Sequence, residues 1–316
     1  MKLIASTAIA LALGLAFATG AAHAEDKKKL YFVVNVPSDF WKAAEAGVKK
    51  AQGELPNYEL ALKYPEQGAA AIQQRLMDDL MAGGAAGIIV SAVDPKTESD
   101  YLNKVGGEIA LFTTDSDAPK TSRAVYIGSS NVLAGEQAGE IMLKAMPDGG
   151  KCMGYVGLLG ADNAKERIQG VKDKIKGSKI ELIDVRGDDG DQTRAKRNVE
   201  DTLTAHPEIN CMVGFYSYNT PQIYAALKDA GKLNQIKIIG FDGDPVTLGG
   251  VKEGSIAGTV VQQPFEWAYQ GMKNMAKYLE GDKSWIPENK LMIVPTKIID
   301  QAGVDAYNTE QAAFLK

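Results

Sequence analysis

Short apolar segments alternate with longer amphipathic segments along most of the chain. Residues 30–36 form the first apolar run, LYFVVNV, which is rich in β-branched and aromatic residues, as a strand buried on both faces should be. Pro37 ends this run, and residues 39–54 then place apolar side chains such as Ala44 and Val48 on one helical face. The pattern predicts a buried strand followed by a helix.

This pair of elements recurs throughout the sequence. In the first half, the expected strands are 30–36, 58–63, 87–90, 109–114 and 125–128, and the expected helices are 39–54, 68–82 and 97–105. In the second half, the expected strands are 152–158, 180–185, 211–215, 236–241, 256–261 and 291–299, and the expected helices are 131–146, 163–176, 191–205, 221–230, 246–253 and 265–279. Such alternation predicts an α/β fold with parallel sheets and right-handed crossovers.

Two arrays of similar length predict two doubly wound parallel-sheet domains. A short polar segment at residues 129–131 marks the change from one array to the next, and return crossings are expected near 262–264 and 294–295. Three crossings form a three-segment hinge beside an interdomain cleft, where ligands commonly bind. The expected units are a signal peptide of residues 1–24, an N-terminal α/β domain of 25–129 plus 263–294, and a C-terminal α/β domain of 130–262 plus 295–316.

The start of the chain has the features of a secretory signal peptide. Lys2 precedes an apolar, Ala-rich stretch at residues 3–19, and residues 22–24 have the small-x-small pattern of a cleavage site. Glu25 is then the expected mature N-terminus. No later run approaches the roughly 18 apolar residues of a membrane span. We therefore expect an exported protein located in the periplasm.

Composition argues against several function classes. A net charge of -5 over 316 residues does not favour nucleic acid binding, which needs a clustered basic surface. After the signal peptide the chain has one histidine, His206, and no CxxC pair, so no metal site is expected. There is neither a Walker-type phosphate loop nor a dinucleotide fingerprint. We expect no cofactor.

The two cysteines lie near the starts of two predicted strands. If the strands that begin near Cys152 and Cys211 are parallel neighbours, the two sulfur atoms lie at the same end of the sheet. An oxidising compartment then permits a disulfide. Two buried free thiols fit equally well, because cysteine is among the residues most often buried.

Catalysis has little support in the sequence. The nucleophile elbow G-x-S-x-G is absent, and His206 stands at a predicted helix end directly before Pro207, a place typical of a solvated or capping side chain. A glycosidase would need two carboxylates facing one bond. Asp115 and Asp242 are the only pair that we consider for that role. We therefore expect that the protein is not an enzyme.

Polar and aromatic residues follow several of the predicted strands, where open α/β sheets bind their ligands. Carboxylates and amides there can bond sugar hydroxyls, an arginine fork can donate to sugar oxygens, and aromatic rings can cover C–H faces. Alternatively, Phe40 and Trp41 only anchor a helix in the core, and a strand-end aspartate such as Asp115 only caps a helix. The residues of this kind are Asn35, Ser38, Phe40, Trp41, Ser91, Asp115, Arg167, Asp242 and Gln262.

At these positions the sequence resembles the periplasmic ribose-binding, or type I, sugar-binding proteins of ABC importers, over essentially the whole mature chain. The most specific segments are Phe40-Trp41, IGSSNVLAG at 127–135, AKER at 164–167, LTAHP at 203–207, IGFDG at 239–243 and GTVVQQP at 258–264. The resemblance implies a non-enzymatic sugar-binding protein that closes by hinge motion.

The resemblance also implies roles for individual residues. Phe40 and Trp41 would stack on the sugar ring, while Asn35, Ser38 and Asp115 would bond its hydroxyls from the first domain. From the second domain and the hinge, the implied contacts are Arg167, Asp242 and Gln262. The family has one more ligand contact, directly after the third strand of the second domain, and either Tyr216 or Asn219 would take its place here.

One departure from the family pattern affects the expected ligand. The family usually has arginine directly after the aspartate that is Asp115 here, and this chain has Ser116. The lost arginine and the added tyrosines Tyr216 and Tyr218 favour a pentose other than ribose, a hexose or a polyol.

Three functions are compatible with the sequence. The first is the solute-binding subunit of an ABC importer, which would bind a monosaccharide or polyol as a monomer and deliver it to a membrane permease, with a chemoreceptor as an optional second partner. The second is a repressor-like sugar sensor, which the signal peptide disfavours. The third is a secreted carbohydrate-acting enzyme.

Overall fold

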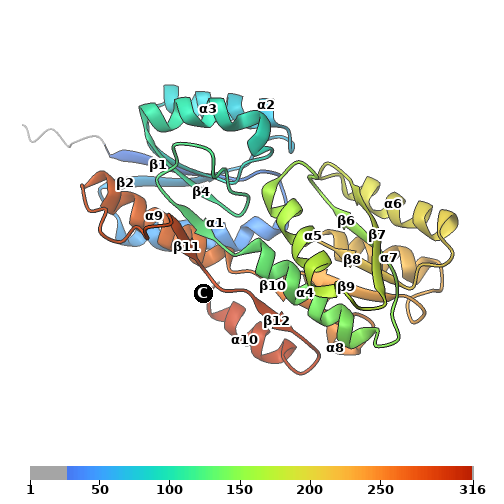
Figure 1. Cartoon of the computed structure of the whole chain (residues 1–316). Helices are drawn as coiled ribbons and strands as arrows, with labels where there is room; N and C mark the ends of the chain where they lie inside the picture. Colours follow the sequence, from blue (N-terminus) through green and yellow to red (C-terminus); the bar gives the residue numbers. More distant parts are fainter. Residues whose placement is uncertain (1–26, 315–316) are drawn as a thin grey trace, which may run out of the picture.

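The computed structural model describes residues 27–314 and contains two six-stranded sheets, each flanked by helices on both faces (Figure 1). The predicted signal peptide lies outside the described residues. The first sheet has the order β11-β5-β4-β3-β1-β2. Its strands are β1 (Lys28–Val33), β2 (Tyr58–Lys63), β3 (Ala85–Val90), β4 (Ala110–Thr114), β5 (Tyr126–Gly128) and β11 (Leu291–Ile293).

The second sheet repeats the plan of the first. Its order is β12-β10-β9-β8-β6-β7, and every described pair in both sheets is parallel except the antiparallel β10–β12 pair. Its strands are β6 (Gly150–Val156), β7 (Ile180–Gly187), β8 (Cys211–Gly214), β9 (Lys237–Phe241), β10 (Gly258–Val261) and β12 (Lys297–Ile299).

Helices cover both faces of each sheet, which is why the central strands are apolar throughout. Phe32, Val33 and Val34 are all fully buried, although they point to alternate faces. In the first domain, the body built on the first sheet, α1 (Lys42–Glu54) and α9 (Pro264–Leu279) pack on one face, and α2 (Ala70–Ala82) and α3 (Pro95–Glu108) cover the other.

The second domain is the body built on the second sheet. There, α4 (Asn131–Ala145) and α5 (Asp162–Ile175) pack together on one face. The opposite face is covered by α6 (Gln192–Ala205), α7 (Asn219–Asp229) and α8 (Pro245–Glu253), and α10 (Val304–Phe314) contacts α8. The predicted fold class of two doubly wound, parallel-sheet domains is confirmed.

The chain passes between the domains three times. It crosses from β5 to α4, returns from β10 to α9, and crosses again from β11 to β12. Pro295 lies in the third crossing, and because proline has no N–H to donate, it cannot continue a strand ladder. The expected single strand at 291–299 is therefore wrong: it is two short strands that belong to different sheets.

Two other local expectations differ from the structure. The helix expected at 39–54 begins with a 3-10 turn, η1 (Asp39–Trp41), and α1 itself starts at Lys42. Helix α10 was not predicted, because its amphipathic pattern is weak.

Candidate functional site

A cavity lies between the domains at the carboxyl ends of both sheets, and we call it the cleft site. It is lined by residues that follow β1 and β4 in the first domain and β6, β8, β9 and β10 in the second. Of the predicted ligand residues, the structure brings together Asn35, Ser38, Phe40, Trp41, Asp115, Arg167, Tyr216, Asp242 and Gln262. Asn219 does not line the cavity.

The aromatic pair of η1 contributes both to the cleft site and to the core. Trp41 is 1% exposed and meets Phe32 and Phe40 edge-on, with ring centroids 5.8 and 4.9 Å apart. Phe40 is half-buried and also contacts Trp267. Trp41 therefore anchors η1 in the core of the first domain, as the alternative interpretation expected. Both rings also line the cleft site, and their stacking on a ligand stays a prediction.

Asp115 and Asp242 occupy equivalent places in the two domains. Asp115 directly follows β4 with φ 52°, and Asp242 directly follows β9 with φ 63°. Few residues other than glycine adopt this left-handed conformation, and aspartate is one that tolerates it. Such backbone strain is concentrated at functional sites. Both carboxylates are almost completely buried at the edge of the cleft.

The Asp115 carboxylate is surrounded by donors from both domains. Within its own domain, Ser91 Oγ donates to it at 2.9 Å and Asn35 Nδ2 at 3.3 Å. From the second domain, Asn163 Nδ2 lies 2.9 Å from both carboxylate oxygens, and an Arg167 amino group lies 3.3 Å from Oδ1. Burial raises the pKa of Asp115 despite these partners. These bonds join the two domains across the cleft.

Arg167 connects five parts of the molecule. It is 2% exposed on α5 and donates to Asn131 on α4, to the Phe215 carbonyl after β8, to Asp115 and to Gln262 in the second crossing. Its guanidinium also lies 5.0 Å from the centroid of the Phe241 ring. A planar fork with several donors suits such a position. Through these bonds Arg167 connects Gln262, in the second crossing, to Asp115 across the cleft site.

Asp242 retains more acceptor capacity than Asp115. Its described hydrogen bonds come from Gln262, from the backbone N–H at 3.3 Å and from the side-chain amide at 3.2 and 3.4 Å. Burial, opposed by Arg167 and Gln262, raises the pKa of Asp242 to about 6. A carboxylate can accept about four hydrogen bonds. Asp242 is thus the acid best prepared to accept hydroxyl donors from a ligand.

Behind the cavity wall, a third buried acid, Asp188, positions Tyr216 and Tyr218. Tyr218 Oη donates to Asp188 at 2.5 Å, and Asn219 Nδ2 donates to the same carboxylate at 2.7 Å. The Asn219 side-chain oxygen also accepts from the backbone N–H of Tyr216. Tyr216 rather than Asn219 therefore faces the cleft site, and Asn219 holds the Tyr216–Tyr218 segment in place.

Sequence reasoning missed four residues that line the cleft site: Val36, Asn163, Ser217 and Tyr218. Asn163 is the second residue of α5, directly after the loop that follows β6, so the strand-end rule used elsewhere was a sufficient signal for it. Ser217 and Tyr218 lie between Tyr216 and Asn219, where the sequence did not decide which residue faces the ligand. Asp188, which holds Tyr218, directly follows β7, so the same rule applies to it.

The cleft site is closed in this structure. Besides the bonds to Asp115, the backbone N–H of Asp162 in the second domain lies 3.2 Å from Ser116 Oγ in the first. The free space between the lining side chains is about 20 Å³, enough for about one water molecule. The two domains are therefore joined across the cleft site by their own polar groups.

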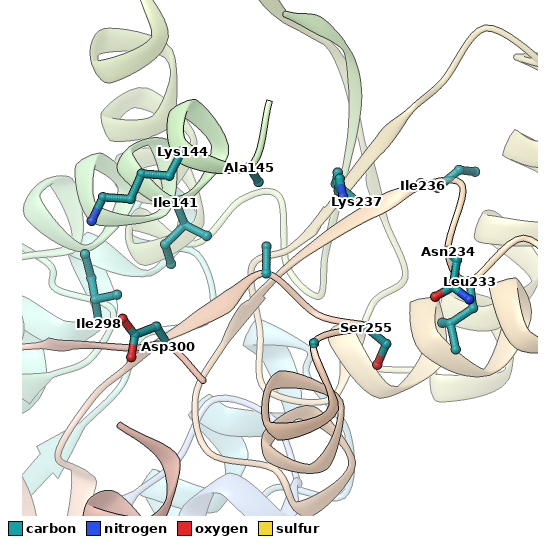
Figure 2. A pocket seen from close by; sticks show the side chains of 12 residues that line it. Ile141, Lys144, Ala145, Leu233, Asn234, Ile236, Lys237, Ser255, Ile298 and Asp300 are labelled. Carbon is teal, nitrogen blue, oxygen red and sulfur yellow. The ribbon is translucent and has the colours of Figure 1, made fainter. Parts of the chain in front are cut away.

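A larger cavity of about 320 Å³ lies elsewhere in the second domain (Figure 2). Lys144 and Ile141 of α4 lie on one side of it with Ile298 and Asp300, and Ser255 lies on another. Because this cavity borders the amino ends of β9 and β10, it lies at the end of the sheet opposite the one where α/β proteins bind ligands. None of the predicted site residues lines it.

The remaining expectations concern sulfur, metals and membranes. Cys152 and Cys211 are register partners on β6 and β8, as expected of parallel neighbours, and both are buried free thiols, so the disulfide alternative is wrong for this structure. Between residues 27 and 314, no cluster of His, Cys, Asp and Glu is arranged to hold a metal ion. Across the same residues, no helix combines the length and apolarity that a membrane span needs.

Comparison with known proteins identifies the family of this chain. A family model described as a periplasmic binding protein domain matches residues 30–283. The chain therefore belongs to this family, whose members bind solutes and are not enzymes. The enzyme hypothesis is excluded, and the resemblance seen in the sequence is confirmed.

Individual relatives cover nearly the whole chain. The chain is 27% identical over 285 residues to the ribose import binding protein of Salmonella typhimurium, covering 90% of this chain and 94% of that protein. It is 26% identical over 288 residues to the D-apiose import binding protein of Paraburkholderia graminis, covering 90% of each. A solute-binding protein from Burkholderia graminis, solved in complex with D-arabinose, has a TM-score of 0.82 at 26% identity, covering 90% of this chain and 99% of that one.

Proposed function

We propose that this protein binds a monosaccharide-like sugar or a polyol in the cleft site and holds it by closure of the two domains. The chain is the solute-binding protein of a sugar ABC importer. The observation that most strongly supports a sugar-like ligand is the convergence of Asp242, Gln262, Phe40 and Trp41 from both domains on one buried cavity. Acceptors for hydroxyls next to flat rings for C–H faces match the chemistry of a pyranose or polyol.

Ligand binding on this proposal is an exchange of partners. Asn163 and Arg167 both donate to Asp115 in the closed structure. A sugar hydroxyl that donates to Asp115, or accepts from Arg167, replaces such a bond and still joins the domains. The ligand then stabilises the closed form only by its greater affinity for closed than for open protein.

The identity of the ligand is narrowed by the relatives. Two relatives are import binding proteins for ribose and D-apiose, and a solved relative is in complex with D-arabinose. We propose a small neutral sugar or polyol of this kind for the present chain. Ser116 stands where the ribose-binding pattern has an arginine, and for that reason we favour a ligand other than ribose.

The cellular setting and the domain limits belong to the same proposal. We place the mature protein in the periplasm after removal of residues 1–24, as a monomer that delivers its ligand to a membrane permease, with a chemoreceptor as a second partner. We set the domain limits at residues 25–129 plus 263–294 and at residues 130–262 plus 295–316. The three chain crossings between the sheets support these limits.

A thermal-shift screen over pentoses, hexoses and polyols tests the proposed ligand class. A ligand that binds only the folded protein stabilises it by about 2.7 kcal/mol at 100 times its Kd, and the unfolding temperature rises accordingly. Positive sugars are then titrated by calorimetry and recovered intact to show that no reaction occurs. If no sugar or polyol raises the unfolding temperature at millimolar concentration, the proposed ligand class is wrong.

A further inference from the structure

A wide groove adjoins the cleft site, and its size and lining bear on the ligand. We call it the outer groove. It has a volume of about 590 Å³, which is within the range of about 300–1,000 Å³ for small-molecule sites. The cleft site and the outer groove share one wall, formed by Phe40, Ser217, Tyr218, Asp242 and Gln262. The outer groove therefore directly adjoins the cleft site at Asp242.

Both domains line the outer groove. The first domain contributes η1 and the start of α1, including Lys42, and the second contributes α8 and α10, including Gly249 and Tyr307. The groove is present while the domains are closed and Asn163 is bonded to Asp115. A ligand group that fills the groove would contact both domains and would therefore stabilise the closed state.

Three aspartates, Asp39, Asp242 and Asp244, and two lysines, Lys42 and Lys252, line the outer groove. Lys42 Nζ lies 2.9 Å from Asp39, and Lys252 Nζ lies 2.6 Å from Asp305. Asp244 accepts from the backbone N–H of Val246 at the start of α8. Because each of the two cations already has an acidic partner, the groove favours a neutral group over a phosphate or a carboxylate.

Its other lining groups are those that bind sugars. The aromatic rings of Phe40, Tyr218 and Tyr307 provide flat surfaces, and the amides of Gln192 and Asn308 provide donors and acceptors. Asp242 lies on the shared wall between this set and the cleft site. The chemistry that suits a sugar hydroxyl in the cleft therefore continues into the groove.

We propose that the cleft site takes its sugar as the terminal unit of a neutral disaccharide or similar glycoside, with that unit at Asp242 and a second glycosyl unit in the outer groove. This inference rests on the proposed sugar-binding function and specifies its ligand class. The volume of the outer groove supports it, because about 590 Å³ is enough room for a second glycosyl unit.

Calorimetry with matched pairs of sugars tests the ligand class. The pairs are xylose and xylobiose, arabinose and arabinobiose, glucose and cellobiose, and myo-inositol and galactinol. At least one disaccharide or glycoside should bind at least tenfold more tightly than its single unit. If monosaccharides bind and every matched glycoside binds equally or more weakly, the outer groove is not a ligand site, although the proposed function stands. If neither kind binds, both proposals fail.

A block in the groove locates the second unit. A Cβ added at Gly249 on α8 would meet nothing within 4 Å, so Gly249→Trp places a ring at the groove without crowding the fold. Gly107 on α3 has the same open surroundings and lies outside the groove, which makes Gly107→Trp the matched control. Gly249→Trp should weaken the glycoside at least tenfold and leave its single unit unchanged. Equal effects on both ligands, or none, would overturn the assignment.

Discussion

At the scale of single residues, the two strand-end aspartates have the same backbone conformation and different surroundings. The Asp115 carboxylate accepts from four side chains, two of them in the opposite domain. Among the described hydrogen bonds, the Asp242 carboxylate accepts only from Gln262. The first carboxylate therefore joins the domains directly, and the second retains the acceptor positions that the proposed ligand would use.

Replacing Asp242 should remove sugar binding without unfolding the protein. Asp242→Asn keeps the shape of the side chain and removes the charge. Hydrogen bonds to a charged group contribute about 1.5–3 kcal/mol each, so the loss of two should weaken binding roughly 100-fold or more. Calorimetry measures the affinity, and circular dichroism confirms the fold. An unchanged affinity would show that Asp242 does not contact the ligand.

Acid should weaken binding through the same carboxyl group. Its pKa is raised to about 6, and the protonated acid is a poorer acceptor, so affinity should fall as the pH drops below about 6. Native Asp242 also keeps a proton between about pH 4 and 6 that the unfolded chain has lost, so its contribution to stability declines as the pH rises through that window. The Asp242→Asn variant should lose this part of the pH dependence of stability, and the pH dependence of affinity is measured on the unaltered protein.

A second acid provides the control for this pH experiment. Burial raises the pKa of Asp188 to about 6 as well, but Asp188 does not line the cleft site and bonds Tyr218 and Asn219 instead. Asp188→Asn should retain the acid-dependent loss of affinity. If Asp188→Asn abolished the acid-dependent loss of affinity, the group that titrates would be Asp188 rather than Asp242.

At the scale of elements, α4 and α5 pack closely enough to fix the position of Arg167. A Cβ on Gly135 of α4 would lie 2.2 Å from the Arg167 carbonyl oxygen, and one on Gly170 of α5 would lie 2.1 Å from the Val132 carbonyl. Both obstacles are backbone atoms, which cannot turn aside as a side chain can. The glycines therefore determine the distance between the helices and, with it, where the guanidinium reaches the cleft.

Adding one methyl group at this contact should affect both stability and binding. Overpacking of this kind costs about 1–3 kcal/mol, and Gly135→Ala should also shift Arg167 and weaken sugar affinity. Denaturant unfolding and calorimetry measure the two effects. Gly53→Ala on α1 is the control, because its Cβ would meet nothing within 4 Å and it should gain up to about 1 kcal/mol. Equal stability of the two variants would show that α4 and α5 tolerate a wider spacing.

At the scale of the whole molecule, closure depends on few bonds between the domains. Asn163 contributes two of the contacts to Asp115, and Tyr216 Oη in turn donates to the Asn163 side-chain oxygen at 2.8 Å. Asn163 is 2% exposed and lies at the start of α5. The equilibrium between open and closed forms should therefore be sensitive to this one amide.

Removing that amide should open the ligand-free protein. Asn163→Ala should raise the radius of gyration measured by small-angle X-ray scattering in the absence of sugar, and saturating sugar should reduce the difference from the unaltered protein. Gln169→Ala, on the exposed side of the same helix, should leave the ligand-free radius unchanged. Identical scattering of Asn163→Ala and the unaltered protein without sugar would contradict the proposed role in closure.

The sequence by itself determined the repeating strand–helix order, the two domains and most of the cleft-site residues. These follow from local rules: apolar runs form buried strands, and parallel strands bring their carboxyl-end residues to one edge. Asp115, Asp242 and Gln262 could be found in this way because each directly follows a strand. Tyr216 and Asn219 could not be distinguished, because their orientation depends on Asp188 from a distant loop.

Only the tertiary structure decided which polar groups use one another as partners. Nothing in the local sequence pairs Asp115 with Asn163, places Asp242 on a shared wall, or opens a groove between α1 and α8, because each arises from segments far apart in the chain. The same holds for residues 291–299, where the parent sheet of each short strand depends on partners elsewhere. The periodicity of apolar residues specifies each helix or strand, whereas the contacts between these elements determine which residues form the cleft site.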